Sequence, residues 1–186
     1  QRRELNDTLL ICSEIFEVAE KNLAEMEIYA CVRRWMKQDQ VSFLNKTLED
    51  PDSSLEEITE SLWRYISLSS EGAELSDSSE KGAHVALLRR IVSDQLNYLK
   101  VAKNYVQIKD FYELLRHSVF PKGSHGQLGG KSAGLFLAHR ILNKHAADNQ
   151  VLRSIKVPKT WYLTSDGLYH FVQHNNLDEV IEQKYK

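Results

Sequence analysis

The strongest constraint on the fold is a row of apolar residues near the N-terminus that lie alternately four and three positions apart. The row consists of Leu5, Leu9, Cys12, Phe16, Ala19, Leu23, Met26 and Ala30. A helix places residues at this spacing on one face, so the sequence predicts one long helix over 5–30. Beside this row lies a second one, made of Ile15, Val18, Tyr29 and Val32, with Ile28 and Trp35 next to it. The combined face is wider than a two-stranded seam, which favours packing inside a helical bundle over a free coiled coil.

A second helix is predicted directly after residue 54. Pro51 interrupts the first helical pattern. Ser54 is followed three residues later by Glu57, which forms a capping box in which the serine oxygen and the glutamate satisfy opposite backbone N–H groups. The buried stripe of this helix is expected to comprise Leu55, Ile58, Leu62, Tyr65 and Ile66.

A polar segment separates this helix from two further ones. Residues 69–82 read SSEGAELSDSSEKG, a composition that predicts a flexible surface loop. Apolar periodicity then predicts a helix from 83 to about 103. Asp110 is expected to cap a shorter helix that ends before Pro121. The residues expected to be buried in that shorter helix are Phe111, Leu114, Leu115 and Val119.

The pattern changes near residue 120, where helices alone give way to alternating helix and strand. A helix is predicted over 132–145, followed by a β-prone run at 160–164 and a helix capped by Ser165 or Asp166. The residues expected to face inward are Leu135, Ala138, Ile141 and Leu142 in the first helix, and Leu168, Phe171 and Val172 in the second. The fold class expected is therefore mainly α (α+β).

The chain is expected to contain two parts. A helical leader domain spans 1–118 and a second domain begins at 119 and runs to 186. The chain starts at Gln1 without an initiator methionine, and it stops directly after a short predicted helix. We therefore expect it to be a piece of a longer protein.

Charge and cysteine content restrict the function classes. A formal net charge of −2 gives no long-range attraction to phosphate backbones, so we expect no nucleic-acid partner. Cys12 and Cys31 lie far apart on one predicted helix, beyond the reach of a disulfide, which indicates a reducing compartment. No apolar stretch is typical of a signal peptide or a membrane span. We expect a cytoplasmic protein without a membrane partner.

The glycine-rich stretch at 123–132, GSHGQLGGKS, is the best candidate for a binding site. It does not fit the pattern G-x-x-x-x-G-K-[ST], because His125 stands where the first glycine belongs. Its last residues nevertheless lie where a helix begins, and unpaired N–H groups, the helix dipole and Lys131 would all favour an anion there. Ser132 can cap the helix or donate a hydrogen bond. An ordinary tight turn with Lys131 in water explains the same residues equally well.

Two separated motifs resemble a known family. Gly129 opens the string GGKSAGL, and Val157-Pro158 follows, leading into a run that ends at Leu163-Thr164 and then a helix with Phe171. This order resembles the start of the nucleotide-binding domain of the pyruvate phosphate dikinase and phosphoenolpyruvate synthase family, which has an ATP-grasp fold. Residues 83–142 also resemble the helical leader of proteins known only as containing a phosphoenolpyruvate/pyruvate-binding domain. One departure is Thr160-Trp161, where the family has Gly-Phe.

The resemblance implies ATP and Mg²⁺ as cofactors of an ATP-dependent phosphotransferase. Lys131 matches the family lysine that contacts ATP phosphates, Gly129 and Gly130 match the glycines before it, and Ser132 follows in the same loop. In the family a carrier histidine passes phosphate to pyruvate or another acceptor. That histidine, the metal ligands and the second half of the cleft lie beyond the residues present here, so the partners include the remaining domains and no catalytic or metal-binding residue is assigned to this chain.

Other candidates are weaker. His125 lies in the same loop as the glycine motif and lacks the context of the carrier histidine, so residues 123–126 are expected to form an approach loop or a flexible cover. His170 and His174 are four apart on a predicted helix, but no third ligand accompanies them. The competing function is a helical regulatory or interaction module without its own catalysis, with the helix at 5–30 as its working surface and as the contact of a homo-oligomer.

Overall fold

The computed structural model describes residues 2–69, 77–177 and 179. In chain order the elements are α1 (Arg2–Asn22), α2 (Glu25–Glu49), α3 (Leu55–Ser69), α4 (Asp77–Leu87), the π-helix η1 (Leu88–Val92), α5 (Leu96–Ala102), α6 (Ile108–Arg116), β1 (Ser118–Val119), α7 (Gly130–Ala146), α8 (Gln150–Ser154), β2 (Tyr162–Leu163) and α9 (Ser165–His174). The expectation of a mainly helical chain is confirmed. None of the helices in the described ranges has an apolar stretch long enough to cross a membrane.

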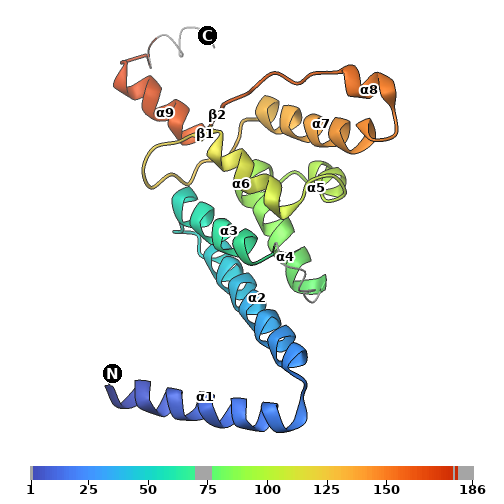
Figure 1. Ribbon diagram of the computed structural model, residues 1–186. Coiled ribbons are helices and arrows are strands. Elements are labelled where there is room, and N and C mark those ends of the chain that lie inside the picture. Colours follow the sequence, from blue (N-terminus) through green and yellow to red (C-terminus); the bar gives the residue numbers. More distant parts are fainter. Residues whose placement is uncertain (1, 70–76, 178, 180–186) are drawn as a thin grey trace.

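The core lies where α2, α3, α4 and α6 pack together (Figure 1). Its most deeply buried side chains are Leu44, Leu55, Ile58, Leu62, Leu87, Leu88, Ile91 and Phe111. Further residues of the same cluster, Phe136 and Tyr162, come from α7 and β2. Apolar contact is therefore continuous from the helical half of the chain into the mixed half.

The start of α3 is confirmed as predicted. The Ser54 backbone N–H donates to the Glu57 carboxylate at 2.7 Å, and the Glu57 N–H donates to Ser54 Oγ at 3.3 Å. The Glu57 carboxylate accepts hydrogen bonds from the Ser54 backbone N–H and, at 3.0 Å, from the Ser54 hydroxyl, and these two bonds lower the pKa of Glu57. The predicted stripe is also confirmed, since Leu55, Ile58 and Leu62 are completely buried.

The single long helix predicted over 5–30 is wrong. The helix ends at Asn22, and α2 begins at Glu25 after a break in which Ala24 is extended (φ −71°, ψ 152°). The Glu27 carboxylate accepts the Ala24 N–H at 2.8 Å, which caps a new helix at this point. Apolar periodicity continues across the break, so the spacing alone does not reveal it.

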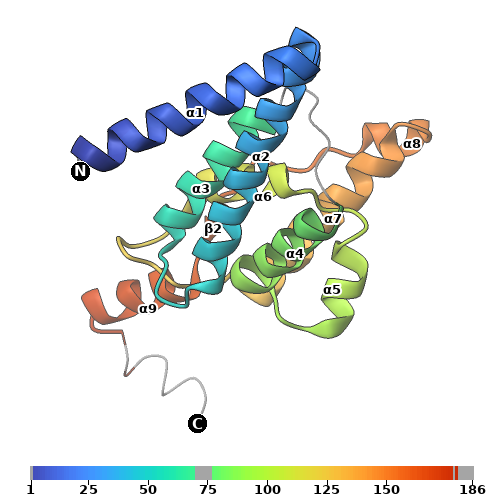
Figure 2. The same cartoon turned by 90° about the horizontal axis from the view of Figure 1, so that it is seen from below.

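The predicted bundle packing of this N-terminal region is also wrong. Figures 1 and 2 show α1 projecting from the end of α2, with the rest of the helices gathered around the other half of α2. Phe16 and Ile15 on α1 are half exposed, and Met26 at the start of α2 is 75% exposed. Burial begins only at Lys37 and Val41, further along α2. We call the largely exposed segment from Leu10 to Met36 the N-terminal arm.

Two boundaries between 69 and 103 differ from the prediction. Asp77–Gly82, expected in the surface loop, are the first residues of α4, and residues 70–76 of that loop lie outside the described residues. The predicted helix from 83 to 103 is interrupted between η1 and α5. There Ser93 is extended (φ −165°, ψ 143°), and its hydroxyl accepts the Gln95 N–H at 3.3 Å. A serine that binds nearby backbone competes with the helix in this way.

The segment after α5 also needs corrections. Helix α6 begins three residues earlier than predicted, because Asp110 does not occupy the N-cap position but accepts the N–H of the N-cap residue Gln107 at 2.8 Å. Val119, expected to be buried in this helix, is 53% exposed and belongs to β1. Strand β1 was not predicted, and it pairs in parallel with β2.

In the C-terminal half the two predicted helices form, but the residues that they bury differ from those expected. The buried side chains of α7 are Ala133 and Phe136, while Leu135 and Ala138 are exposed. Helix α9 is capped by the Thr164 hydroxyl, which accepts the Gly167 N–H, and not by Ser165 or Asp166. In α9 only Val172 of the three expected inward residues is buried; the other two, Leu168 and Phe171, are more than half exposed. Helix α8, capped by the Asn149 side chain, was not predicted.

Candidate functional site

The predicted phosphate-binding residues lie at the start of α7. Gly129 is the N-cap residue, in an extended conformation (φ −67°, ψ 156°), and the helix begins at Gly130. Gly129, Gly130 and Lys131 are exposed, and Ser132 is half-buried. The first helical hydrogen bond runs from the Ala133 N–H to the Gly129 carbonyl at 2.9 Å. The N–H groups of residues 130–132 therefore precede the helical pairing and can face an anion.

Space in front of this helix end is open. A Cβ atom built on Gly129 or Gly130 would meet no atom within 4 Å in the described part of the chain. Packing within this chain therefore does not require glycine at either position. Glycine here leaves room for a group that approaches the backbone closely.

The two motifs of the family resemblance lie side by side. Leu128, directly before Gly129, forms an antiparallel bridge with Thr164 at the end of β2. The Ser165 N–H donates to the Gln127 carbonyl at 2.9 Å, and the Gln127 N–H donates to Ser165 Oγ at 3.2 Å. The Leu128 N–H also donates to the Ile91 carbonyl at 2.9 Å, which ties this strip to η1.

Residues 123–126, expected to form an approach loop, possibly a flexible cover, form a loop that is hydrogen-bonded to α9. The Asp166 carboxylate accepts hydrogen bonds from the Ser124 hydroxyl at 2.7 Å and from the N–H groups of His125 and Gly126, both at 3.1 Å. A Cβ atom at Gly126 would lie 2.0 Å from Asp166 Oδ1, so only glycine fits at this position. The loop is an anchor between the bundle and α9.

The Asp166 carboxylate is held in its charged form. Burial acts to raise the pKa of Asp166, but hydrogen bonds from the Thr164 and Ser124 hydroxyls and from the Gly167 and His125 N–H groups outweigh it and lower the pKa. The carboxylate also lies in the first turn of α9, where the helix dipole favours a negative charge. Its role is structural.

His125 takes part in the same anchor. The Arg90 guanidinium donates to the Ser53 carbonyl at 2.9 Å and to the His125 carbonyl at 3.0 Å. The His125 ring nitrogen Nδ1 lies 3.1 Å from the Ser53 carbonyl, so the ring is used to join the loop to the start of α3. His170 and His174 lie along α9, and within the described ranges no group of three His, Cys, Asp or Glu residues could hold a metal ion.

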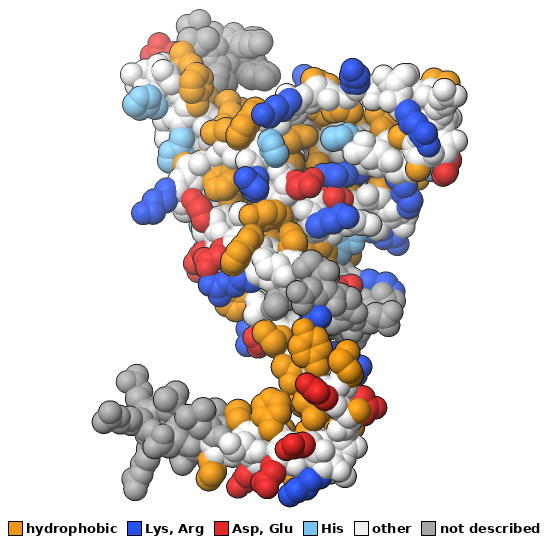
Figure 3. Space-filling model, viewed as in Figure 1, with side chains coloured by type: hydrophobic (Ala, Val, Ile, Leu, Met, Phe, Trp, Pro, Cys, Tyr) orange, Lys and Arg blue, Asp and Glu red, His pale blue; other side chains and the backbone are white. Residues whose placement is uncertain are grey.

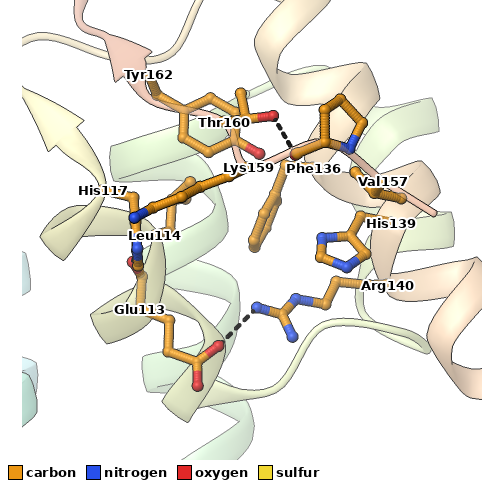
Figure 4. Close-up of a pocket in the computed structure, with 11 residues that line it drawn as sticks. Glu113, Leu114, His117, Phe136, His139, Arg140, Val157, Lys159, Thr160 and Tyr162 are labelled. Carbon is orange, nitrogen blue, oxygen red and sulfur yellow. Dashed lines mark hydrogen bonds and ion pairs between the residues drawn. The ribbon is translucent and has the colours of Figure 1, made fainter.

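A small cavity that the sequence did not predict lies between α6, α7 and the segment that leads into β2 (Figure 4). Its volume is about 210 Å³, and it lies against the middle of α7, away from Gly129 and Lys131. Its polar lining comprises Glu113, His117, His139, Arg140, Lys159 and Thr160, with Leu114, Phe136, Val157, Pro158 and Tyr162 as the apolar part. These residues come from three separated segments, and no motif joins them.

Comparisons of the chain with protein-family models, with curated proteins and with solved structures gave no match in any of the three.

Proposed function

We propose that this chain is the N-terminal portion of an ATP-dependent phosphotransferase resembling phosphoenolpyruvate synthase and pyruvate phosphate dikinase. In this proposal residues 119–186 are the start of an ATP-grasp-like domain, and Gly129, Gly130, Lys131 and Ser132 bind phosphate groups of ATP. The observation that carries the proposal is the bridge between Leu128 and Thr164, because it joins two motifs that lie far apart in the sequence.

The chemistry of the proposed site follows from the start of α7. The N–H groups of Gly130, Lys131 and Ser132 provide fixed donors, whereas that of Ala133 is already used by the Gly129 carbonyl. The helix dipole adds about half a positive charge, and the exposed Lys131 ammonium adds a full one that can follow the phosphate oxygens. These groups neutralise charge on a phosphoryl group, which is the main protein contribution to phosphoryl transfer.

The rest of the reaction belongs to other parts of the parent protein in this proposal. The described residues offer no acidic cluster that fits Mg²⁺, so we derive no step through the metal from this chain. The carrier histidine and the acceptor, pyruvate or another small molecule, are likewise assigned to the remaining domains. This chain supplies one wall of the nucleotide site and the helical bundle that supports it.

The test is ATP affinity measured by calorimetry on the whole protein with Lys131→Ala. Loss of a charged contact to phosphate is expected to weaken binding by about tenfold or more. Lys122→Ala is the matched control, since Lys122 is an exposed lysine of the preceding loop. Equal affinities of the wild type and the Lys131 variant would contradict the proposal.

A second candidate function is favoured by the N-terminal arm: a helical regulatory or interaction module that joins two copies of the chain. Figure 3 shows hydrophobic side chains gathered over α1 and the first half of α2. A hollow of about 510 Å³ lies where these two helices meet, lined by Phe16, Glu25, Met26, Ile28, Tyr29 and Val32. Within α1 the apolar residues keep the alternating spacing of four and three positions, and the same face of a second copy can pack against them, so a second copy is the occupant in this proposal.

Sedimentation velocity tests this second candidate. The wild-type chain is expected to form a dimer at micromolar concentration, and Phe16→Asp is expected to make it monomeric by placing a charge in the seam. Val151→Asp is the control, because Val151 is 72% exposed and lies on the distant helix α8. A wild-type chain that stays monomeric at all concentrations would rule out the dimer.

A further inference from the structure

We propose that the cavity between α6, α7 and residues 157–162 binds a small oxyanion, a carboxylate or a phosphate. This site is separate from the start of α7, and the proposal goes beyond the nucleotide-binding function. A volume of about 210 Å³ is below the roughly 300–1,000 Å³ typical of sites for drug-sized ligands. The occupant is therefore an ion or a molecule of a few non-hydrogen atoms.

Arg140 forms a fixed wall of the cavity. Its guanidinium binds Asp110 Oδ1 and Glu113 Oε2, both at 3.1 Å, and lies over the Phe136 ring with 5.5 Å to the ring centroid. The two carboxylates belong to α6, so the ion pairs hold α6 and α7 together at this point. The carboxylates of Asp110 and Glu113 therefore both bind Arg140, and these contacts hold its guanidinium in one orientation.

The Arg140 Nε–H is the observation that points to a ligand. It is buried, and no atom of the described residues accepts a hydrogen bond from it. A buried donor without an acceptor is costly, and a ligand oxygen that reached Nε would satisfy it. Figure 4 shows the guanidinium beside the His139 ring at the same wall.

The opposite side of the cavity carries further nitrogen groups. Figure 4 shows the Lys159 side chain extending across the cavity toward His117. The His117 ring is held from two sides, since its Nδ1 lies 2.8 Å from the Glu113 carbonyl and its ring lies 5.4 Å from that of Trp161. Contact with a carbonyl oxygen requires Nδ1 to carry a proton, so Nε2 of the neutral His117 ring is an acceptor and can meet only a protonated oxygen of the ligand.

The groups around the cavity therefore match an oxyanion better than a neutral ligand. Lys159 supplies a full positive charge, and Arg140 supplies an N–H that lacks an acceptor. Phe136, Pro158 and Tyr162 form an apolar lining that excludes water from one side and strengthens these contacts. A carboxylate and a phosphate share this chemistry.

The experiment is an NMR titration of the ¹⁵N-labelled chain with inorganic phosphate and, separately, with acetate. Saturable shifts of the backbone N–H signals of Val157, Lys159 and Thr160 are expected with at least one anion. Lys159→Ala is expected to weaken that binding by about tenfold, while Lys156→Ala, an exposed lysine of the same segment that does not line the cavity, leaves it unchanged. Substitution at Lys159 avoids the risk of unfolding that accompanies loss of the Arg140 ion pairs.

Each outcome decides the proposal. Saturation by phosphate alone assigns a phosphate ligand, and saturation by acetate alone assigns a carboxylate. Absence of saturable binding by both anions overturns the proposal, as does an equal loss of affinity in the Lys156 and Lys159 variants. Lys131→Ala is expected to leave this binding unchanged, so failure here is distinguishable from failure of the nucleotide proposal.

Discussion

The N-terminal arm and helix α3 carry the same kind of apolar pattern with opposite results. On α3 the pattern faces the core, where Leu55, Ile58 and Leu62 are completely buried. On the arm, Phe16 and Tyr29 remain about half exposed. Apolar periodicity therefore predicts that a helix forms and which face it would bury, but it does not identify what covers that face. The partner of α3 is within this chain, whereas the arm has none in the described residues.

The two regions are expected to differ most in how much a single substitution lowers the free energy of unfolding. Leu62→Ala is expected to lower the free energy of unfolding by about 2–5 kcal/mol, because it leaves a cavity in a tightly packed core. Phe16→Ala is expected to change it by less than about 0.5 kcal/mol at concentrations where the chain is monomeric. Urea denaturation followed by circular dichroism measures both. Similar losses for the two variants would mean that the arm packs against the bundle in solution.

The next largest change in the free energy of unfolding is expected in the loop of residues 123–126, which we call the anchor loop. Gly126→Ala is expected to destabilise the fold by roughly 1–3 kcal/mol, since the new methyl group would collide with the Asp166 carboxylate. Gly134→Ala is the matched control on α7, where a Cβ atom meets nothing within 4 Å. That variant is expected to stabilise the helix by up to about 1 kcal/mol. If Gly126→Ala left the free energy of unfolding unchanged, residues 123–126 would have to move away from α9 in solution.

Asp166→Asn is expected to have a smaller, pH-dependent effect. The pKa of Asp166 is lower in the folded chain than its ordinary value, so its carboxylate stabilises the fold above that ordinary value and the stabilisation is lost as the pH falls toward the folded pKa. At neutral pH the loss in the variant is expected to be about 1 kcal/mol, a reduced value because solvent reaches the carboxylate. Urea midpoints at pH 7 and at acidic pH check this. If the wild type remained more stable than Asp166→Asn by the same amount at acidic pH, this expectation would be contradicted.

The parts of the fold that depend on neighbouring residues could be predicted from the sequence. The start of α3 follows from Ser54 and Glu57, which contact each other three residues apart. The break at Ala24 could not be found from spacing, because the apolar row continues through it. Strand β1 could not be found either, since two residues carry almost no pattern and its partner β2 lies more than forty positions later.

The site illustrates the same limit. The exposed N–H groups and Lys131 follow from a short motif at a helix start, so the sequence alone locates them correctly at the beginning of α7. The anchor role of Asp166 depends on Ser124 and Gly126, which lie about forty residues away in the chain. The cavity beside Arg140 requires three segments to meet. Neither feature has a local signal, and only the packing of the chain brings their residues together.

The most direct test of the central claim is a titration of the ¹⁵N-labelled whole protein with ATP, followed by the backbone N–H signals of residues 125–132. The account predicts that the signals of Gly130, Lys131 and Ser132 shift together and saturate, because their N–H groups face the phosphates. It also predicts that the N–H signals of His125 and Gly126 stay in place, because they are already bound by Asp166. Shifts confined to the anchor loop, or no shifts at 130–132 at any ATP concentration, would contradict the claim that α7 begins a nucleotide site.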